Sequence, residues 1–222
     1  MKNINIKFES GKKYALVGAS VSGKSTILNL LCRFYEIDEG SITIGNINIK
    51  DVDLKTLRNS INHISQDNQL FHDTILNNIT YANENENILS VENTCRLSGI
   101  LEFIDSTPKK WDTMVGDQGT TLSGGQKQRI SIARSLLKVP QIILLDEATS
   151  AIDSENEREI LQNICRHYTD KTIIITSHRL STIKFVDEII YLQDGKVIES
   201  GSHNELIKKR GYYWNLFKDQ IE

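Results

Sequence analysis

The sequence predicts an α/β fold in which a parallel-sheet core carries an antiparallel β subdomain and an inserted α-helical lobe. Two nearly continuous apolar runs, Ile142–Leu145 and Thr172–Thr176, are typical of parallel strands that are buried on both faces. The middle of the chain has few strand-like runs and mostly helical spacing of its apolar residues, which predicts a lobe inserted into the core. The expected boundaries are 1–66 and 138–222 for the core and 67–137 for the lobe.

Local patterns predict the first elements of the core. Alternation of Ile4, Ile6 and Phe8 with polar residues predicts a half-buried strand. Tyr14–Val17 predicts a short buried strand that runs into a glycine-bearing loop. Apolar residues at helical spacing then predict a helix from about Ser25 to Phe34.

Two β-hairpins and two further helical regions complete the predicted core. The dipeptides Gly45-Asn46 and Asp194-Gly195 each lie between two strand-like runs and are typical two-residue hairpin turns. A helix over Ser154–Arg166 is expected as the crossover between the two buried strands. The tail His203–Glu222 is amphipathic and predicts helix.

Composition limits the classes of function. Of the 222 residues, 39% are hydrophobic and 25% charged, which is typical of a soluble globular chain. The net charge of -3 argues against a nucleic-acid partner. The three cysteines form no CxxC pair, which argues against a zinc site or disulfide framework and fits a reducing compartment. No apolar run reaches the ~20 residues of a membrane helix, and no signal peptide opens the chain.

Residues 18–25 predict a phosphate-binding loop because they match GxxxxGK[ST] between a strand and a helix. Glycines allow successive N–H groups to face phosphate oxygens, and the helix start adds partial positive charge. Lys24 is expected to neutralise the β and γ phosphates, and the Ser25 hydroxyl to ligate Mg²⁺. The flanking strand and helix disfavour a chance match. The expected nucleotide contacts are Gly18, Ala19, Ser20, Val21, Ser22, Gly23, Lys24, Ser25 and Thr26.

Two carboxylates, Asp146 and Glu147, follow the first buried apolar run. Acidic residues are common at strand ends, but the presence of a phosphate loop favours a metal-binding and catalytic role for this pair. Asp146 is expected to hold Mg²⁺, usually through water. Glu147 is expected to polarise the attacking water as a general base. The alternative for Glu147 is a surface residue at a helix start.

The string Leu122-Ser123-Gly124-Gly125-Gln126 predicts a second anion site. Ser123 is a favourable N-cap, and an apolar stripe follows it at helical spacing. N–H groups at the start of the helix could bind an anion. An ordinary capped helix is the alternative, but two adjacent glycines would then destabilise its first turn. The expected nucleotide contacts here are Ser123, Gly124, Gly125 and Gln126.

This string resembles the signature sequence of the ATP-binding cassette (ABC) family, and the resemblance covers essentially the whole chain. It implies a P-loop NTPase (RecA-like) fold and the nucleotide-binding domain of an exporter-type transporter. In that family the phosphate loop and the signature that bind one nucleotide come from different subunits.

Other family elements also match. Ser65-Gln66-Asp67 resembles the loop whose glutamine contacts Mg²⁺ and the attacking water. Ser150-Ala151-Ile152-Asp153 resembles the D-loop at the dimer interface, so Asp153 joins the expected nucleotide contacts. His178 stands where the family places its switch histidine. A lone histidine is usually structural, but the end of a parallel strand favours the functional role. The implied catalytic residues are Glu147, His178 and Gln66, and the implied metal ligands are Ser25, Gln66 and Asp146.

Exporter features and departures are both present. Thr113–Gly119 resembles the X-loop of exporters, and Gly201–Leu206 resembles their C-terminal region, but Met114 replaces the usual glutamate. Val21 occupies a usual glycine position, where a β-branched residue restricts the backbone. No aromatic residue precedes the first strand to stack on adenine. The expectation is a fragment of a longer polypeptide with an N-terminal membrane-spanning half.

The resemblance therefore implies an ATPase that binds and hydrolyses MgATP in a head-to-tail dimer, with a second copy or another nucleotide-binding domain. It would power export through transmembrane domains, at the cytoplasmic face of a membrane and without nucleic acid. One alternative is an importer ATPase subunit, which the X-loop-like stretch disfavours. Another is a soluble ABC ATPase, which usually carries a coiled coil or tandem cassette. A non-hydrolysing regulatory cassette is disfavoured by Glu147 and His178.

Overall fold

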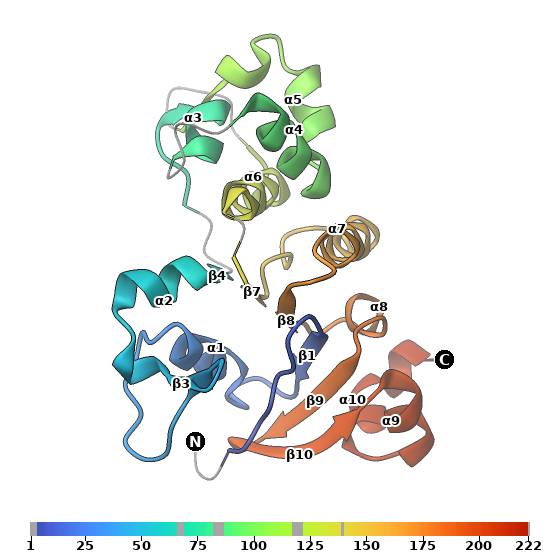
Figure 1. Ribbon diagram of the computed structural model, residues 1–222. Coiled ribbons are helices and arrows are strands. Elements are labelled where there is room, and N and C mark those ends of the chain that lie inside the picture. Colours follow the sequence, from blue (N-terminus) through green and yellow to red (C-terminus); the bar gives the residue numbers. More distant parts are fainter. Residues whose placement is uncertain (1–3, 66–68, 82–86, 117–121, 139, 222) are drawn as a thin grey trace. The chain divides into compact units, whose positions relative to one another are not determined.

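The computed structural model describes residues 4–65, 69–81, 87–116, 122–138 and 140–221 (Figure 1). The chain divides into two compact units. The first comprises residues 1–63, 140–146 and 169–222, and the second comprises residues 64–139 and 147–168.

The first unit is built on a six-stranded sheet with the order β10-β9-β1-β8-β7-β4 among the described residues. Pairing is parallel from β9 through β1 and β8 to β7, and β10 is antiparallel to β9. The parallel core predicted from the two apolar runs is therefore confirmed. The strands are β1 (Lys13–Val17), β4 (Ile61–Ile64), β7 (Ile142–Asp146), β8 (Thr172–Thr176), β9 (Glu188–Gln193) and β10 (Lys196–Gly201).

Helices and a small hairpin complete this unit. Tyr14, Leu16 and Leu144 of the sheet pack with Leu28 of the first helix and with Ile49 and Leu57 in one apolar core. Helices α9 and α10 contact β10 at the edge of the sheet (Figure 1). The elements are α1 (Lys24–Leu31), β2 (Thr43–Ile44), β3 (Ile47–Asn48), the 3₁₀ helix η1 (Ile49–Asp51), α2 (Leu54–Ser60), α8 (Leu180–Ile183), α9 (His203–Lys209) and α10 (Tyr212–Ile221).

Both predicted hairpins form, and their turns explain why. Gly45 and Asn46 have φ of 56° and 69°, and Asp194 and Gly195 have φ of 50° and 68°. Two consecutive positive φ values are characteristic of the type I′ turn, which matches the twist of the flanking strands. Glycine, asparagine and aspartate tolerate this backbone best. The turn residues therefore set the register of β2–β3 and of β9–β10.

The strand predicted at Ile4, Ile6 and Phe8 is wrong. Ile4, Ile6 and Phe8 are half-buried and the residues between them are exposed, but the segment forms no strand. The three half-buried side chains pack against the apolar core of the first unit. Alternating burial thus arises here from packing alone, without a hydrogen-bonded ladder.

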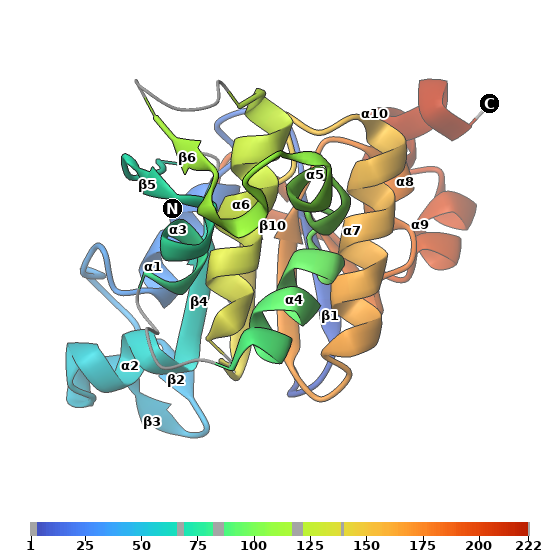
Figure 2. The same cartoon turned by 90° about the horizontal axis from the view of Figure 1, so that it is seen from above.

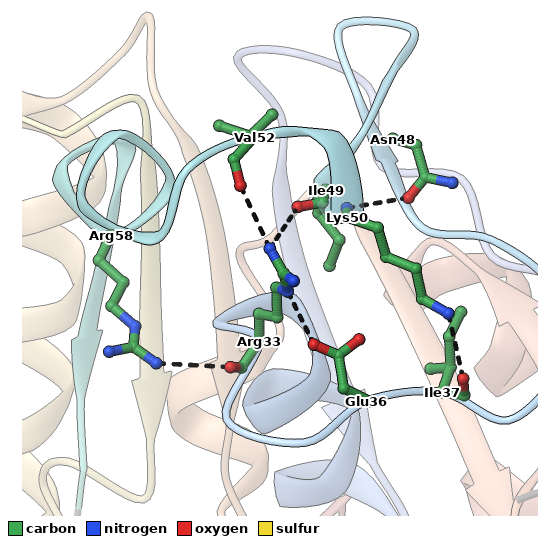
Figure 3. Close-up of polar contacts among 8 residues, drawn as sticks. All are labelled: Arg33, Glu36, Ile37, Asn48, Ile49, Lys50, Val52 and Arg58. Atoms are coloured by element: carbon green, nitrogen blue, oxygen red, sulfur yellow. Dashed lines mark hydrogen bonds and ion pairs between the residues drawn. The ribbon is translucent and has the colours of Figure 1, made fainter.

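Arg33 joins the end of α1 to the hairpin region, a link that the sequence did not predict (Figure 3). Its Nη1 donates to the carbonyl oxygens of Ile49 (3.3 Å) and Val52 (3.2 Å), and its Nε pairs with Glu36 at 2.9 Å. Arg58 of α2 donates in turn to the carbonyl of Arg33 at 3.4 Å. Arg33 itself has φ of 51°, so the chain reverses sharply where α1 ends.

The second unit is helical. Figure 2 shows α6 with α3 on one side and α4 on the other. Helix α7, expected as part of the core, contacts α4 and groups with this unit. A two-stranded sheet, β5–β6, was not predicted. The elements are β5 (Asp73–Thr74), α3 (Ile75–Thr80), α4 (Ile88–Leu97), α5 (Leu101–Ser106), the 3₁₀ helix η2 (Lys110–Asp112), β6 (Met114–Val115), α6 (Gly124–Leu137) and α7 (Ser154–His167).

Within the described part of the chain, no helix has the length and apolar character needed to cross a bilayer.

Candidate functional site

The loop between β1 and α1 has the geometry of a phosphate cradle. Gly18 has φ of 148°, and a Cβ atom there would lie 2.1 Å from the carbonyl oxygen of Leu192. Gly23 has φ of 104° and is the N-cap of α1, with no side-chain cap hydrogen bond. The helix therefore begins without a side chain covering its first N–H groups, which suits an anion. The glycines are needed both for backbone conformation and for space.

Lys24 lies folded over this loop. Its side chain is only 6% exposed, and Nζ donates to the carbonyl oxygens of Gly18 and Ala19, both at 3.0 Å. Ser22 is buried as well, and its carbonyl accepts from the N–H of Gly195 at 3.2 Å. The ammonium group is thus held at the centre of the loop. Of the other predicted contacts, Ala19, Ser20, Ser25 and Thr26 are exposed.

Val21 stands out on this loop because its backbone has φ of 65° and its side chain is 100% exposed. The left-handed conformation costs an L-residue about 1–2 kcal/mol. No packing of the side chain offsets that cost. The restriction that a β-branched residue imposes at this position therefore takes the form of local strain.

A cluster of three polar side chains lies at the carboxyl ends of β7 and β8 in the first unit: Asp146, Thr176 and, from α1, Ser25. Asp146 Oδ1 accepts from Ser25 Oγ at 3.0 Å and from Thr176 Oγ1 at 2.8 Å. A hydroxyl and a carboxylate are ligands that Mg²⁺ accepts together with substrate phosphates and water. Among the described residues, no group of three or more His, Cys, Asp or Glu side chains could hold a metal ion alone. The residues present therefore fit an Mg²⁺ that arrives with a phosphate ligand.

The sheet order brings the predicted motifs to one edge. The phosphate loop follows β1, His178 follows β8 and Asp146 ends β7, and these three strands are parallel neighbours. Ligands of parallel sheets bind outside the carboxyl ends of the strands. His178 is exposed, and its carbonyl accepts from Gln220 Nε2 of α10 at 3.4 Å.

Glu147 directly follows Asp146 and has φ of 48°. Positive φ at a residue other than glycine is strained and is concentrated at functional sites. Its carbonyl accepts from the N–H of Ser150 at 3.1 Å, so a tight turn leads from the strand end into the predicted D-loop.

The signature segment of the second unit begins helix α6. Ser123 is the N-cap: its Oγ accepts from the N–H of Gln126 at 3.2 Å, and Gln126 Oε1 accepts from the N–H of Ser123 at 2.9 Å. This capping box leaves the N–H groups of Gly124 and Gly125 outside its hydrogen bonds. The predicted N-cap is confirmed, and Gln126 has a structural task beside its predicted contact. The predicted apolar stripe of Ile130, Ala133, Leu136 and Leu137 is buried.

Asp153, one of the predicted nucleotide contacts, has a capping role. Asp153 is the N-cap of α7, accepting from the N–H of Asn156 at 3.1 Å and from Asn156 Nδ2 at 2.8 Å. These bonds, led by that to the Asn156 side chain, lower the pKa of Asp153. Gln66 lies outside the described residues, as does the end of the predicted X-loop. Met114, at its start, pairs with Thr74 in the β5–β6 sheet.

Asn78 and Gln128 are among the buried polar residues that the sequence did not predict. Asn78 is 0% exposed and bonds to the segment before α3 and to Arg134. Gln128 is 1% exposed and bonds to the D-loop. A usable signal existed for Gln128, which lies four residues before Ile132 and hence on the same helix face.

Comparisons with known proteins identify the family of this chain. The model of the ABC transporter family matches residues 1–150. ATP-dependent lipid A-core flippases of Vibrio parahaemolyticus, Photobacterium profundum and Escherichia coli K12 are 46%, 45% and 45% identical over 222 residues. These matches cover 100% of this chain and 38% of each relative, so the chain spans well under half of their length.

A solved structure gives the same result. The structure of a bacterial Atm1-family ABC exporter with ATP bound matches with a TM-score of 0.93 and 40% identity, over 99% of this chain and 39% of that chain. The predicted P-loop NTPase fold and the predicted exporter-type resemblance are thereby confirmed. Since the family match extends over more than half of the chain, and the phosphate loop and signature segment have the expected local geometry, this chain belongs to the ABC transporter family.

Proposed function

We propose that this chain is the nucleotide-binding domain of an exporter, which binds MgATP and hydrolyses it to drive transport across a membrane. The observation that carries the proposal is the cluster at the carboxyl ends of β1, β7 and β8. There Lys24 lies within a glycine-shaped loop, and Asp146 shares its Oδ1 between Ser25 and Thr176. This arrangement offers positive charge and N–H groups to phosphates, with oxygen ligands beside them.

Each residue then has a physical role. Lys24 can turn from the loop carbonyls to the β and γ phosphates, which offer it full negative charge. Ser25 and Asp146 would hold the Mg²⁺, which supplies charge neutralisation of the phosphates when bound. Glu147 accepts a proton from the attacking water as general base. His178 orients that water and contacts the γ-phosphate, and Gln66 contacts the Mg²⁺ and the same water.

The nucleotide contacts from Ser123, Gly124 and Gly125 are proposed to come from a second chain. The N–H groups at the start of α6 and those at the start of α1 belong to separate compact units. A head-to-tail pair related by a two-fold axis would let each signature segment close on the partner's nucleotide. Asp153 and the rest of the D-loop would then lie at the interface. The partner is a second copy of this chain or another nucleotide-binding domain.

The names of the relatives support a role in export at a membrane. The curated relatives are named as ATP-dependent flippases, and the solved structure is an exporter. We infer that transmembrane domains, which make up other parts of such proteins, dock on this chain at the cytoplasmic face of the membrane. The cargo is decided by those domains.

The test is ATP hydrolysis by Glu147→Gln. Turnover should fall by at least ~100-fold, the usual scale for losing a general base, while ATP binding by titration is retained. Glu159→Gln is the matched control, because it makes the same change at an exposed position of α7. The proposal fails if both variants hydrolyse ATP at the wild-type rate, or if wild-type protein shows no ATP hydrolysis.

A further inference from the structure

A buried glutamine ties the signature helix to the D-loop. Gln128 lies on the second turn of α6 and is 1% exposed. Its Oε1 accepts from the N–H of Ala151 at 2.9 Å, and its Nε2 donates to Ser150 Oγ at 3.4 Å. Both partners are exposed at the surface, so a buried side chain holds a surface loop. A buried amide with both ends bonded fixes the geometry of what it holds more strictly than an apolar contact does.

The two glycines of the signature segment bring the same loop close. A Cβ atom at Gly125 would lie 3.2 Å from the carbonyl oxygen of Ala151, and one at Gly124 would lie 3.4 Å from the Cβ of Ala151. The first distance is too short for an undisturbed contact, so any side chain at Gly125 would push Ala151 away. These glycines therefore allow close approach of the D-loop as well as access for an anion.

The D-loop follows closely after Glu147, the predicted general base. The carbonyl of Glu147 accepts from the N–H of Ser150 at 3.1 Å, and Thr149 Oγ1 donates to Glu157 Oε1 at 2.7 Å in a buried pair. Two hydrogen bonds thus connect the start of α6 to Glu147: one joins Gln128 to Ala151, and the other joins Ser150 to Glu147. All four residues lie within the second compact unit.

We propose that Gln128 is a positioning residue that couples the two nucleotide sites of the dimer. This inference rests on the proposed function, in which the signature segment of a chain contacts the partner's nucleotide and Glu147 acts on the chain's own nucleotide. A shift of the signature helix when it closes on the partner's ATP moves Ser150 and Ala151 through Gln128. The turn at Glu147 follows, so the general base is placed correctly only when the other site is occupied.

The experiment measures ATP hydrolysis against ATP concentration for wild type, Gln128→Met and Gln162→Met. Methionine keeps the length of the side chain and removes both hydrogen bonds, and Gln162 is a half-exposed position on α7 outside this network. For Gln128→Met we expect kcat to fall about 3- to 30-fold, the range for residues that transmit coupling. The Hill coefficient should fall from above 1 to 1, while ATP affinity measured in the Glu147→Gln background stays within ~2-fold.

A purely structural role gives a different result. Loss of stability would lower the active fraction, so kcat would fall with the Hill coefficient unchanged, and that outcome overturns the coupling role. Ser150→Ala tests the same link from the loop and remains informative if Gln128→Met does not fold. The double variant should be no worse than Gln128→Met alone, because both changes break one connection. Additive losses would contradict the proposal. Absence of hydrolysis or of any ATP-dependent dimer in wild type would instead reject the proposed function.

Discussion

Asn78 holds together the segment Phe71–Thr74, which leads into α3. Its Oδ1 accepts from the N–H of Phe71 at 2.8 Å, and its Nδ2 donates to the carbonyls of Phe71 (2.9 Å) and Thr74 (3.0 Å). Arg134 of α6 adds a charged donor at 2.9 Å to the same Oδ1. The side chain is 0% exposed, so water does not take over these partners if it is lost.

Asn78→Ala should therefore destabilise the chain strongly. The three neutral hydrogen bonds of 3.0 Å or less, at about 1 kcal/mol each, and the charged bond, at about 2 kcal/mol, sum to about 5 kcal/mol. Partial relaxation of the exposed segment lowers this to about 3–5 kcal/mol. Asn77→Ala is the matched control, because Asn77 Nδ2 makes one exposed bond to Asp73 Oδ1 at 2.8 Å. The control should lose no more than about 0.5 kcal/mol, and the change in helix propensity is the same for both.

Thermal unfolding monitored by circular dichroism measures the difference. For a chain of this size each kcal/mol shifts Tm by about 2–4 °C, so Asn78→Ala should unfold about 6–20 °C below wild type. Asn77→Ala should unfold within about 2 °C of wild type. Equal Tm values for the two variants would refute the claim that the Asn78 network holds this segment.

Two further predictions concern Val21 and His63. Val21→Gly should raise the free energy of unfolding by up to about 1 kcal/mol, because release of about 1–2 kcal/mol of strain exceeds the entropy cost of glycine. The control Val21→Ile should not raise it. If urea titration shows that Val21→Gly lowers the free energy of unfolding, the backbone of Val21 is not strained. Burial lowers the pKa of His63, and the smaller attraction of Asp146 does not reverse this. The unfolded chain therefore binds the proton more tightly, so stability is complete above pH ~6.5 and falls as the pH drops below it. His63→Leu should reduce this slope; a part remains because burial also lowers the pKa of His203. An unchanged slope would contradict the assignment.

The sequence predicted elements wherever a local rule fixes the backbone. The buried strands β7 and β8 followed from their continuous apolar runs, and the two hairpins followed from dipeptides that tolerate positive φ. The strand at residues 4–8 was wrong, because alternation reports one-sided burial and a strand also needs a partner in the sheet. Helix α2 and the β5–β6 sheet are too short to leave a clear period in the sequence.

The candidate site was likewise predictable only where its residues form local motifs. Motif residues such as Lys24 and Ser123 could be identified because their spacing and neighbours are local. Other bonds join distant segments and leave no periodic signal: Asp146 to Thr176, Gln128 to Ala151, and Arg134 to Asn78. The capping task of Asp153 was recognisable in principle, because aspartate before a helix is a favoured N-cap.

The mass of Glu147→Gln in sizing chromatography with light scattering tests the central claim most directly. We expect twice the chain mass of 25.2 kDa with MgATP and the mass of a single chain with MgADP. ATP bound by the loop of Lys24 presents its γ-phosphate to the N–H groups that begin α6 of the partner, whereas ADP does not reach them. Adding Ser123→Arg should abolish the ATP-dependent dimer. A monomer at all ATP and protein concentrations, together with a hydrolysis rate per chain that does not change on dilution, would contradict the two-chain site.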